Sequence, residues 1–136
     1  MEKKITVGIN GFGRIGRNLF RLLLNNPSIE VRAVNDLADT KTLGHLLKYD
    51  SIHGVLKEEI SISDNEINVA GEKIKFFSEK NIEDISWGNL DVVVECTGKF
   101  KLRNQLENHL KNGAKRVILS VPPIEDDIKY PGPYGP

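Results

Sequence analysis

The sequence has little cysteine, no excess of either charge and no long apolar run. A single cysteine, Cys96, excludes an internal disulfide and a cysteine-rich zinc site, and it favours a reducing, cytoplasmic location. The 19 basic and 19 acidic residues balance within each half of the chain, which argues against a nucleic-acid-binding arm. The apolar runs are too short for a membrane span or a signal peptide, so we expect neither membrane insertion nor export.

Proline is scarce until the end of the chain, where it becomes frequent. Only Pro27 precedes residue 122, whereas residues 130–136 consist of proline, glycine and tyrosine alone. Proline removes a backbone donor and blocks helices and central strands. We therefore expect residues 130–136 to form a tail that is distinct from a domain spanning residues 1–129.

The first part of the sequence has the pattern of a βαβ unit. Short β-branched runs at residues 5–9 and 30–34 flank a helical pattern from about residue 14 to residue 25. Pro27 ends this helix because proline disfavours helical backbone in the residue before it. The apolar stripe of the helix is expected to pack on a sheet.

The alternation of strands and helices continues downstream. We expect a helix over 42–49, extended stretches over 55–62 and 66–77 with a hairpin turn at 70–72, a strand over 91–95, a helix over about 102–111, and a strand over 116–120. The run at 91–95 is apolar on both faces at its centre, as a buried parallel strand is. The sequence therefore predicts an α/β fold with a Rossmann-type, doubly wound, mostly parallel sheet and a small antiparallel insertion.

A glycine-rich turn follows the first predicted strand directly. Gly11, Gly13 and Gly16 form a GxGxxG motif with a strand before it and a helix after it. In a dinucleotide site the first glycine allows the tight turn, the second lets the backbone approach a pyrophosphate, and the third lets the helix pack on the strand. The alternative is a glycine-rich turn that binds nothing.

Asp36 stands 20 residues after Gly16, at the end of the second predicted strand. A carboxylate at this place accepts hydrogen bonds from the adenosine ribose and repels a 2′-phosphate, which favours NAD over NADP. The alternative role is a cap on the following helix, for which Asp39 and Thr40 are equally good candidates.

Five short segments, in order along the chain, carry a family resemblance. They are VGINGFGRIGR at 7–17, NDL at 35–37, LLKYDSIHG at 46–54, ECTG at 95–98 and VILS at 117–120. The series resembles the amino-terminal part of the glyceraldehyde-3-phosphate dehydrogenase family over residues 1 to about 129. The related erythrose-4-phosphate dehydrogenases share the opening motif and are the alternative. The family's last strand of this domain and its catalytic domain are expected to be absent from this sequence.

The resemblance implies a set of NAD-binding residues. Lys80 would lie near the adenine, with a solvated surface lysine as the alternative, and Phe100 would line the adenine side, with a core aromatic as the alternative. Ser120 would lie near the nicotinamide ribose. The whole set is Asn10, Gly11, Phe12, Gly13, Arg14, Ile15, Asp36, Lys80, Thr97, Gly98, Phe100 and Ser120.

The residues that the family uses for catalysis have no counterpart in this sequence. The family oxidises glyceraldehyde 3-phosphate through a cysteine thiohemiacetal, passes hydride to NAD and transfers the acyl group to inorganic phosphate, but its Ser-Cys-Thr-Thr-Asn motif is missing. We interpret Cys96 as an inert core thiol because no activating cation is adjacent to it. His45, His53 and His109 are expected to be exposed or locally hydrogen-bonded, and their spacing predicts no metal site.

The resemblance therefore predicts a chain that binds NAD weakly and does not turn over substrate alone. The family assembles as homotetramers, and we expect an incomplete domain to assemble poorly and to expose apolar sheet surface. The alternative is a non-catalytic binding or interaction module, in which the tail at 130–136 is a polyproline-like ligand segment.

Overall fold

The computed structural model describes residues 3–49 and 59–120. Its helices and strands are β1 (Ile5–Asn10), α1 (Arg14–Leu24), β2 (Ile29–Asn35), α2 (Thr40–Lys48), β3 (Ile60–Ile62), β4 (Glu66–Val69), β5 (Glu72–Phe77), the 3-10 turn η1 (Ile82–Asp84), β6 (Leu90–Glu95), α3 (Arg103–Lys111) and β7 (Ala114–Leu119). The predicted stretch at 55–58 and the tail at 130–136 lie outside the described residues.

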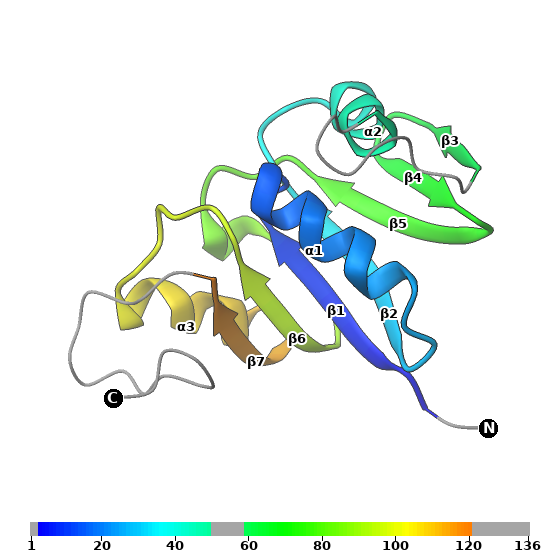
Figure 1. Cartoon of the computed structure of the whole chain (residues 1–136). Coiled ribbons are helices and arrows are strands. Elements are labelled where there is room, and N and C mark those ends of the chain that lie inside the picture. Colours follow the sequence, from blue (N-terminus) through cyan, green and yellow to red (C-terminus); the bar gives the residue numbers. More distant parts are fainter. Residues whose placement is uncertain (1–2, 50–58, 121–136) are drawn as a thin grey trace.

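One sheet holds the seven strands, in the order β3-β4-β5-β2-β1-β6-β7 (Figure 1). The five strands from β5 to β7 in this order pair in parallel, and β3 and β4 pair antiparallel. This confirms the predicted Rossmann-type α/β fold with an antiparallel insertion. The insertion is joined more closely than the sequence indicated, because β5 belongs both to the predicted hairpin and to the parallel sheet.

The turns and helix ends follow from local chemistry. Ala70 and Gly71, with φ of 53° and 86°, make the hairpin turn between β4 and β5. The α2 helix begins two residues earlier than predicted because the Asp39 carboxylate accepts a hydrogen bond of 2.7 Å from the Thr42 N–H and caps the helix. The α1 helix ends at Leu24, just before the predicted proline stop.

The sheet has a separate apolar core on each face. Val7 and Ile9 of β1 pack on the face covered by α1, together with Phe20 of that helix. Gly8 lies between them and faces the other way, and a Cβ there would meet Trp87 and Leu90 within 3 Å. Figure 1 shows α1 across β1 and β2, whereas α3 lies beside β6 and β7.

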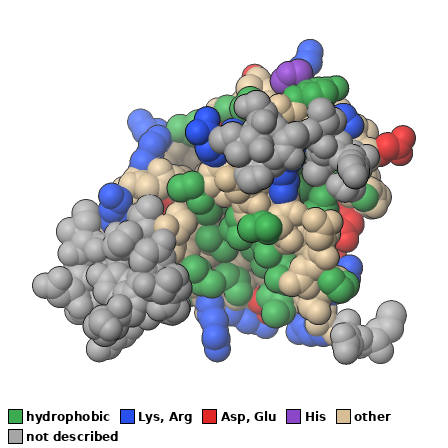
Figure 2. All heavy atoms as spheres, in the orientation of Figure 1, with side chains coloured by type: hydrophobic (Ala, Val, Ile, Leu, Met, Phe, Trp, Pro, Cys, Tyr) green, Lys and Arg blue, Asp and Glu red, His purple; other side chains and the backbone are tan. Residues whose placement is uncertain are grey.

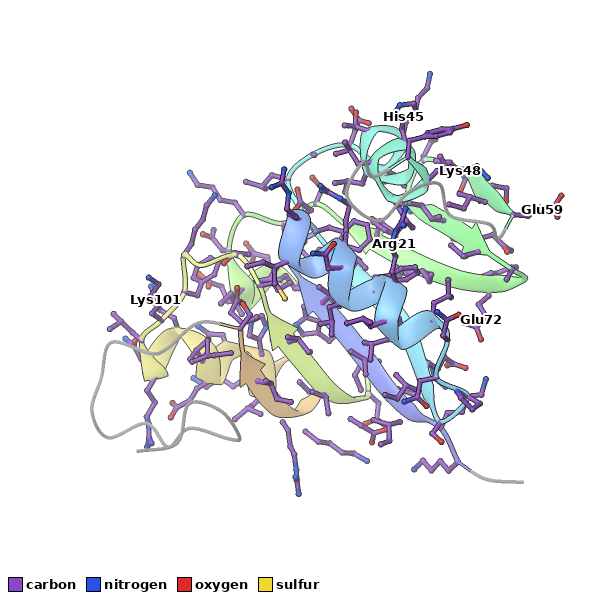
Figure 3. All side chains as sticks on the ribbon, viewed as in Figure 1. Arg21, His45, Lys48, Glu59, Glu72 and Lys101 are labelled. Carbon is purple, nitrogen blue, oxygen red and sulfur yellow. The ribbon has the colours of Figure 1, made fainter. Side chains whose placement is uncertain are left out.

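Arg21 ties α1 to α2. Its side chain extends from α1 (Figure 3), and Nη2 donates hydrogen bonds to the carbonyl oxygens of Leu47 and Lys48, at 2.5 and 3.4 Å. These carbonyls belong to the last turn of α2, where they have no partner within the helix. The guanidinium therefore satisfies the end of one helix from the side of another.

Part of the α1 face remains exposed. Ile15 and Leu22 on α1 are 53% and 74% exposed, and Ile118 on β7 is 40% exposed. Ile118 pairs with Val94, which packs against the core of this face, so both side chains lie on the same side of the sheet. Figure 2 shows hydrophobic side chains gathered here.

Candidate functional site

A cavity of about 450 Å³ opens at the carboxyl ends of the parallel strands. Its walls come from the turn after β1, the residues after β2 and β5, and the loop after β6. Strand order makes this edge a crevice, since the connections from β1 and from β6 leave toward opposite faces of the sheet. Ligands of open parallel sheets bind at such a point.

The three glycines of the turn each meet a different constraint. Gly11 has φ of +98°, and a Cβ there would lie 2.8 Å from the backbone nitrogen of Thr97. A Cβ on Gly16 would lie 2.1 Å from the carbonyl oxygen of Gly11, so this glycine permits close packing of α1 on the turn. Gly13 lines the cavity and has no atom within 4 Å of its Cβ position, which leaves its backbone open to a ligand.

Asp36 fastens the end of β2 to the glycine turn. Its Oδ2 accepts a hydrogen bond of 2.7 Å from the Phe12 N–H, and its Oδ1 accepts one of 2.9 Å from the Ala38 N–H. Asp39 caps the next helix, so the capping role considered for Asp36 is wrong. A carboxylate accepts about four hydrogen bonds, so two of these acceptor sites on Asp36 remain for ligand hydroxyls.

Most residues predicted for the site lie on the wall of this cavity. Lys80 is exposed there, and Phe100 is half-buried and belongs to neither apolar core. The predicted residues on the wall are Asn10, Gly11, Gly13, Asp36, Lys80, Thr97 and Phe100.

The other predicted residues lie beside the cavity. The Phe12 ring is fully buried in the core on the α1 face, and its backbone contributes to the turn. Arg14 and Ile15 form the exposed first turn of α1, and Gly98 lies exposed in the loop after β6. Ser120 directly follows β7, and its hydroxyl donates a hydrogen bond of 2.9 Å to the carbonyl oxygen of the last residue of β6.

Sequence reasoning missed several wall residues. Asn35 and Leu37 flank Asp36, whereas Glu79 and Asn81 flank Lys80, and Lys99 lies in the loop after β6. Both pairs could have been found by adjacency to a predicted residue. The second pair reaches this edge because β5 pairs in parallel with β2, which nothing in the local pattern indicated.

A second hollow, of about 430 Å³, lies between α2 and β3. It is lined by His45, Tyr49, Ile60 and neighbouring residues, away from the carboxyl ends of the central parallel strands. Within residues 3–49 and 59–120, no group of three acidic, histidine or cysteine side chains could hold a metal ion. The same residues include no helix long and apolar enough to cross a membrane.

The comparisons with known proteins agree with this geometry. A family model described as "Glyceraldehyde 3-phosphate dehydrogenase, NAD binding domain" matches residues 5–103. The chain belongs to the glyceraldehyde-3-phosphate dehydrogenase family. NAD is the cofactor of the domain that this match describes.

Curated relatives show the same similarity. The chain is 53% identical over 126 residues to the glyceraldehyde-3-phosphate dehydrogenase of Geobacillus stearothermophilus, a match covering 91% of the chain and 38% of the relative. It is 54% identical over 127 residues to glyceraldehyde-3-phosphate dehydrogenase 2 of Streptomyces avermitilis, covering 91% and 38%. It is 49% identical over 130 residues to the Mycoplasma pneumoniae enzyme, covering 94% and 39%. The chain thus spans less than two fifths of the length of these relatives.

Cys96 follows β6 in this member of the glyceraldehyde-3-phosphate dehydrogenase family, and its environment suppresses the thiolate. Burial is the main cause that raises the pKa of the thiol to about 11, with a smaller contribution from the Glu95 carboxylate, and the hydrogen bond with Ser120 partly offsets the shift. A nucleophilic cysteine needs a lowered pKa. The raised pKa of Cys96 is the opposite of this requirement.

His109 differs from the expectation of an exposed or locally bonded imidazole. It belongs to α3, is fully buried, and forms hydrogen bonds to Trp87 and Glu95, which lie 22 and 14 residues away. The helix around it is rich in asparagine and charge, so its pattern gave no sign of burial. His53 lies outside the described residues, and His45 is on the exposed side of α2.

Proposed function

We propose that this chain is the NAD-binding part of a phosphorylating glyceraldehyde-3-phosphate dehydrogenase of glycolysis, located in the cytoplasm. Bound NAD would accept the hydride when glyceraldehyde 3-phosphate is oxidised, and inorganic phosphate would accept the acyl group. The observation that supports this most directly is the cavity at the strand ends, bounded by the open backbone at Gly13 on one side and Asp36 on the other.

The residues of the cavity fit the parts of a dinucleotide. The backbone N–H groups at the start of α1, from Arg14 and Ile15, would hold the pyrophosphate, because the first N–H groups of a helix have no partner within it. Asp36 would accept hydrogen bonds from the adenosine ribose hydroxyls. Lys80 and Phe100 would lie along the adenine, where Lys80 would contribute a positive charge and Phe100 an aromatic ring.

The remaining predicted residues would complete the binding of the ligand. Thr97 and Gly98 would line the adenine side of the crevice, and Ser120 would lie toward the nicotinamide ribose. The chain alone is expected to bind NAD weakly, because less ligand surface is covered than in a longer enzyme of the family. Turnover is expected to be undetectable, since Cys96 holds its proton and no other cysteine is present.

Titration of the 136-residue chain with NAD and with NADP tests this function. We expect saturable NAD binding that is tighter than NADP binding, measured by calorimetry. Asp36→Ala is expected to weaken NAD binding about tenfold and to reduce the preference over NADP, because two hydrogen bonds to a charged acceptor and a charge repulsion are lost together.

Asp64→Ala is the matched control, since it removes an exposed carboxylate in the turn between β3 and β4. It should bind NAD like the unaltered chain. A chain that shows no saturable binding, or an Asp36→Ala variant that binds as well as Asp64→Ala, would contradict the proposed function.

A further inference from the structure

A buried carboxylate lies directly beneath the candidate site. Glu95, the last residue of β6, is 1% exposed and does not line the cavity. Its Oε1 accepts hydrogen bonds from Asn10 Nδ2 at 2.7 Å and from His109 Nε2 at 2.8 Å. Its Oε2 accepts from the Thr97 N–H at 3.0 Å and from the Thr97 hydroxyl at 2.6 Å. All four acceptor sites of the carboxylate are therefore used.

Trp87 determines which ring nitrogen of His109 carries the proton. An indole N–H can only donate, and Trp87 Nε1 lies 2.9 Å from His109 Nδ1, so this ring nitrogen must accept. The imidazole proton is then on Nε2, which donates to Glu95. The imidazole is neutral in this arrangement, because a proton on both nitrogens would place two donors against each other.

The same network continues along the carboxyl edge of the sheet. Asn10 Oδ1 accepts a hydrogen bond of 2.8 Å from Asn35 Nδ2. Asn35 in turn donates to the Glu79 carbonyl at 2.9 Å and accepts from the Glu79 N–H at 2.8 Å. The chain of hydrogen bonds thus joins the ends of β6, β1, β2 and β5, and four of its members, Asn10, Asn35, Glu79 and Thr97, line the cavity.

We propose that Glu95 is the positioning residue of this site, which holds Asn10 and Thr97 in the geometry that binds the dinucleotide, and that His109 with Trp87 holds Glu95 in turn. The proposal rests on the proposed NAD binding. A buried carboxylate is stable only while its donors are in place, so the bonds constrain both side chains together. Asn10 and Glu95 are 85 positions apart in the sequence, so no local structure could provide this constraint.

The His109 variants separate positioning from mere stability. His109→Gln keeps a donor at the position of Nε2, whereas His109→Leu removes it and leaves a carboxylate acceptor unpaired. We expect His109→Leu to weaken NAD binding about tenfold and His109→Gln to restore most of the lost affinity. Glu95→Gln should have an effect similar to His109→Leu, because its amide donors face donors from Asn10, His109 or Thr97.

Thr6→Val is the matched control, because it removes a different polar link between β1 and β6, the strands that Asn10 and Glu95 join. The Thr6 hydroxyl donates to Asp91 Oδ2 at 3.1 Å and accepts from the Asp91 N–H at 2.9 Å, at the opposite end of β1 and β6. The Thr6→Val variant should lower the stability of the chain and leave its NAD affinity within about twofold of that of the unaltered chain. Hydrogen exchange at the Thr97 amide in the ligand-free chain gives a second readout, and it should be faster in His109→Leu than in Thr6→Val.

The outcomes distinguish this proposal from the proposed function. If the unaltered chain binds NAD but His109→Leu binds equally well, or no worse than Thr6→Val, the positioning role is overturned and the proposed function stands. The positioning role is likewise overturned if His109→Gln fails to recover affinity. If the unaltered chain does not bind NAD at all, the proposed function fails, and unchanged exchange at Thr97 in His109→Leu would then overturn the positioning of that residue as well.

Discussion

Cys96 and Asp36 show how the surroundings of single residues decide their chemistry. Both follow a parallel strand at the same edge of the sheet. The thiol is mostly buried beside a carboxylate, which favours its neutral form, whereas Asp36 receives two backbone N–H donors and keeps acceptor sites free. The pKa of Cys96 is therefore raised where a nucleophilic cysteine needs a lowered one, and Asp36 keeps the acceptor sites that the proposed binding of ribose hydroxyls requires.

The raised pKa of Cys96 predicts slow reaction with thiol reagents. With a pKa of about 11 against an ordinary 9.0, the folded chain holds about 100-fold less thiolate at neutral pH. The rate of reaction with a disulfide reagent, followed by absorbance between pH 7 and 9, should be lower than in the denatured chain by about this factor. Equal rates in the folded and denatured chains would contradict the burial described for Cys96.

Single residues were predictable where their spacing is local. The GxGxxG motif and Asp36 depend on fixed offsets from one strand, so the sequence revealed their placement around one turn. His109, Trp87 and Glu95 depend on contacts across 14 and 22 residues, and the polar pattern of α3 hid the burial of His109. The local pattern of apolar and polar residues does not predict such contacts.

At the scale of elements, the junction of β1 and α1 separates a packing requirement from a binding requirement. Gly16 lies against the carbonyl of Gly11, while Gly13 faces open space. The two glycines therefore meet different requirements although they are only three residues apart in sequence. Their alanine variants therefore form a matched pair.

Gly16→Ala is expected to destabilise the chain by about 2 kcal/mol or more, because its Cβ would lie 2.1 Å from a backbone oxygen and the helix must shift. Gly13→Ala is expected to change stability by less than about 1 kcal/mol, since no atom lies within 4 Å of its Cβ position. Its methyl group would instead obstruct a pyrophosphate and weaken NAD binding. Urea denaturation and NAD titration of both variants measure the two effects, and a stable Gly16→Ala variant would contradict the packing described.

The amino end of the β1 and β6 pair has its own pH dependence. Hydrogen bonds from the Thr6 N–H and then the Thr6 hydroxyl hold the pKa of Asp91 below its usual 3.8, with a smaller contribution from Lys115. Because the folded pKa is lowered, this carboxylate stabilises the fold above about pH 4, and the contribution is lost as pH falls through the lowered value.

Thr6→Val should therefore raise the pKa of Asp91 and lower the unfolding free energy more at about pH 7 than at about pH 2.5. Carboxyl chemical shifts report the pKa, and urea denaturation at the two pH values reports the difference in stability. An equal destabilisation at both pH values would show that the hydroxyl does not act through the charge of Asp91.

For the whole molecule, the sequence predicted the parallel sheet and its insertion but not how the insertion is attached. The strand runs and helix stops are local signals, so element order followed from them. Pairing of β5 with β2 depends on contacts across about 40 residues, which no local period encodes. This pairing is what brings the residues after β5 to the edge of the cavity.

The exposed apolar side chains on the α1 face predict self-association of the chain at high concentration. Ile118→Lys should reduce it by placing a charge within this face. Leu110→Lys is the control, since Leu110 is 45% exposed on α3, and this helix packs on the opposite face, where its His109 accepts a hydrogen bond from Trp87 of that core. Sedimentation velocity over a concentration series should show a larger decrease for Ile118→Lys, and equal behaviour of the two variants would contradict the assignment to the α1 face.

The contact between Gly11 and Thr97 also determines when the crevice can exist during synthesis. The glycine turn is made early, but the residues against which it packs, and the carboxylate of Glu95 that binds Asn10, are added more than 80 residues later. Contacts of such long sequence separation form late because the intervening chain must first be ordered. A nascent chain that ends before β6 therefore carries a complete GxGxxG motif without a binding site, and the cofactor can assist folding only after that strand has joined the sheet.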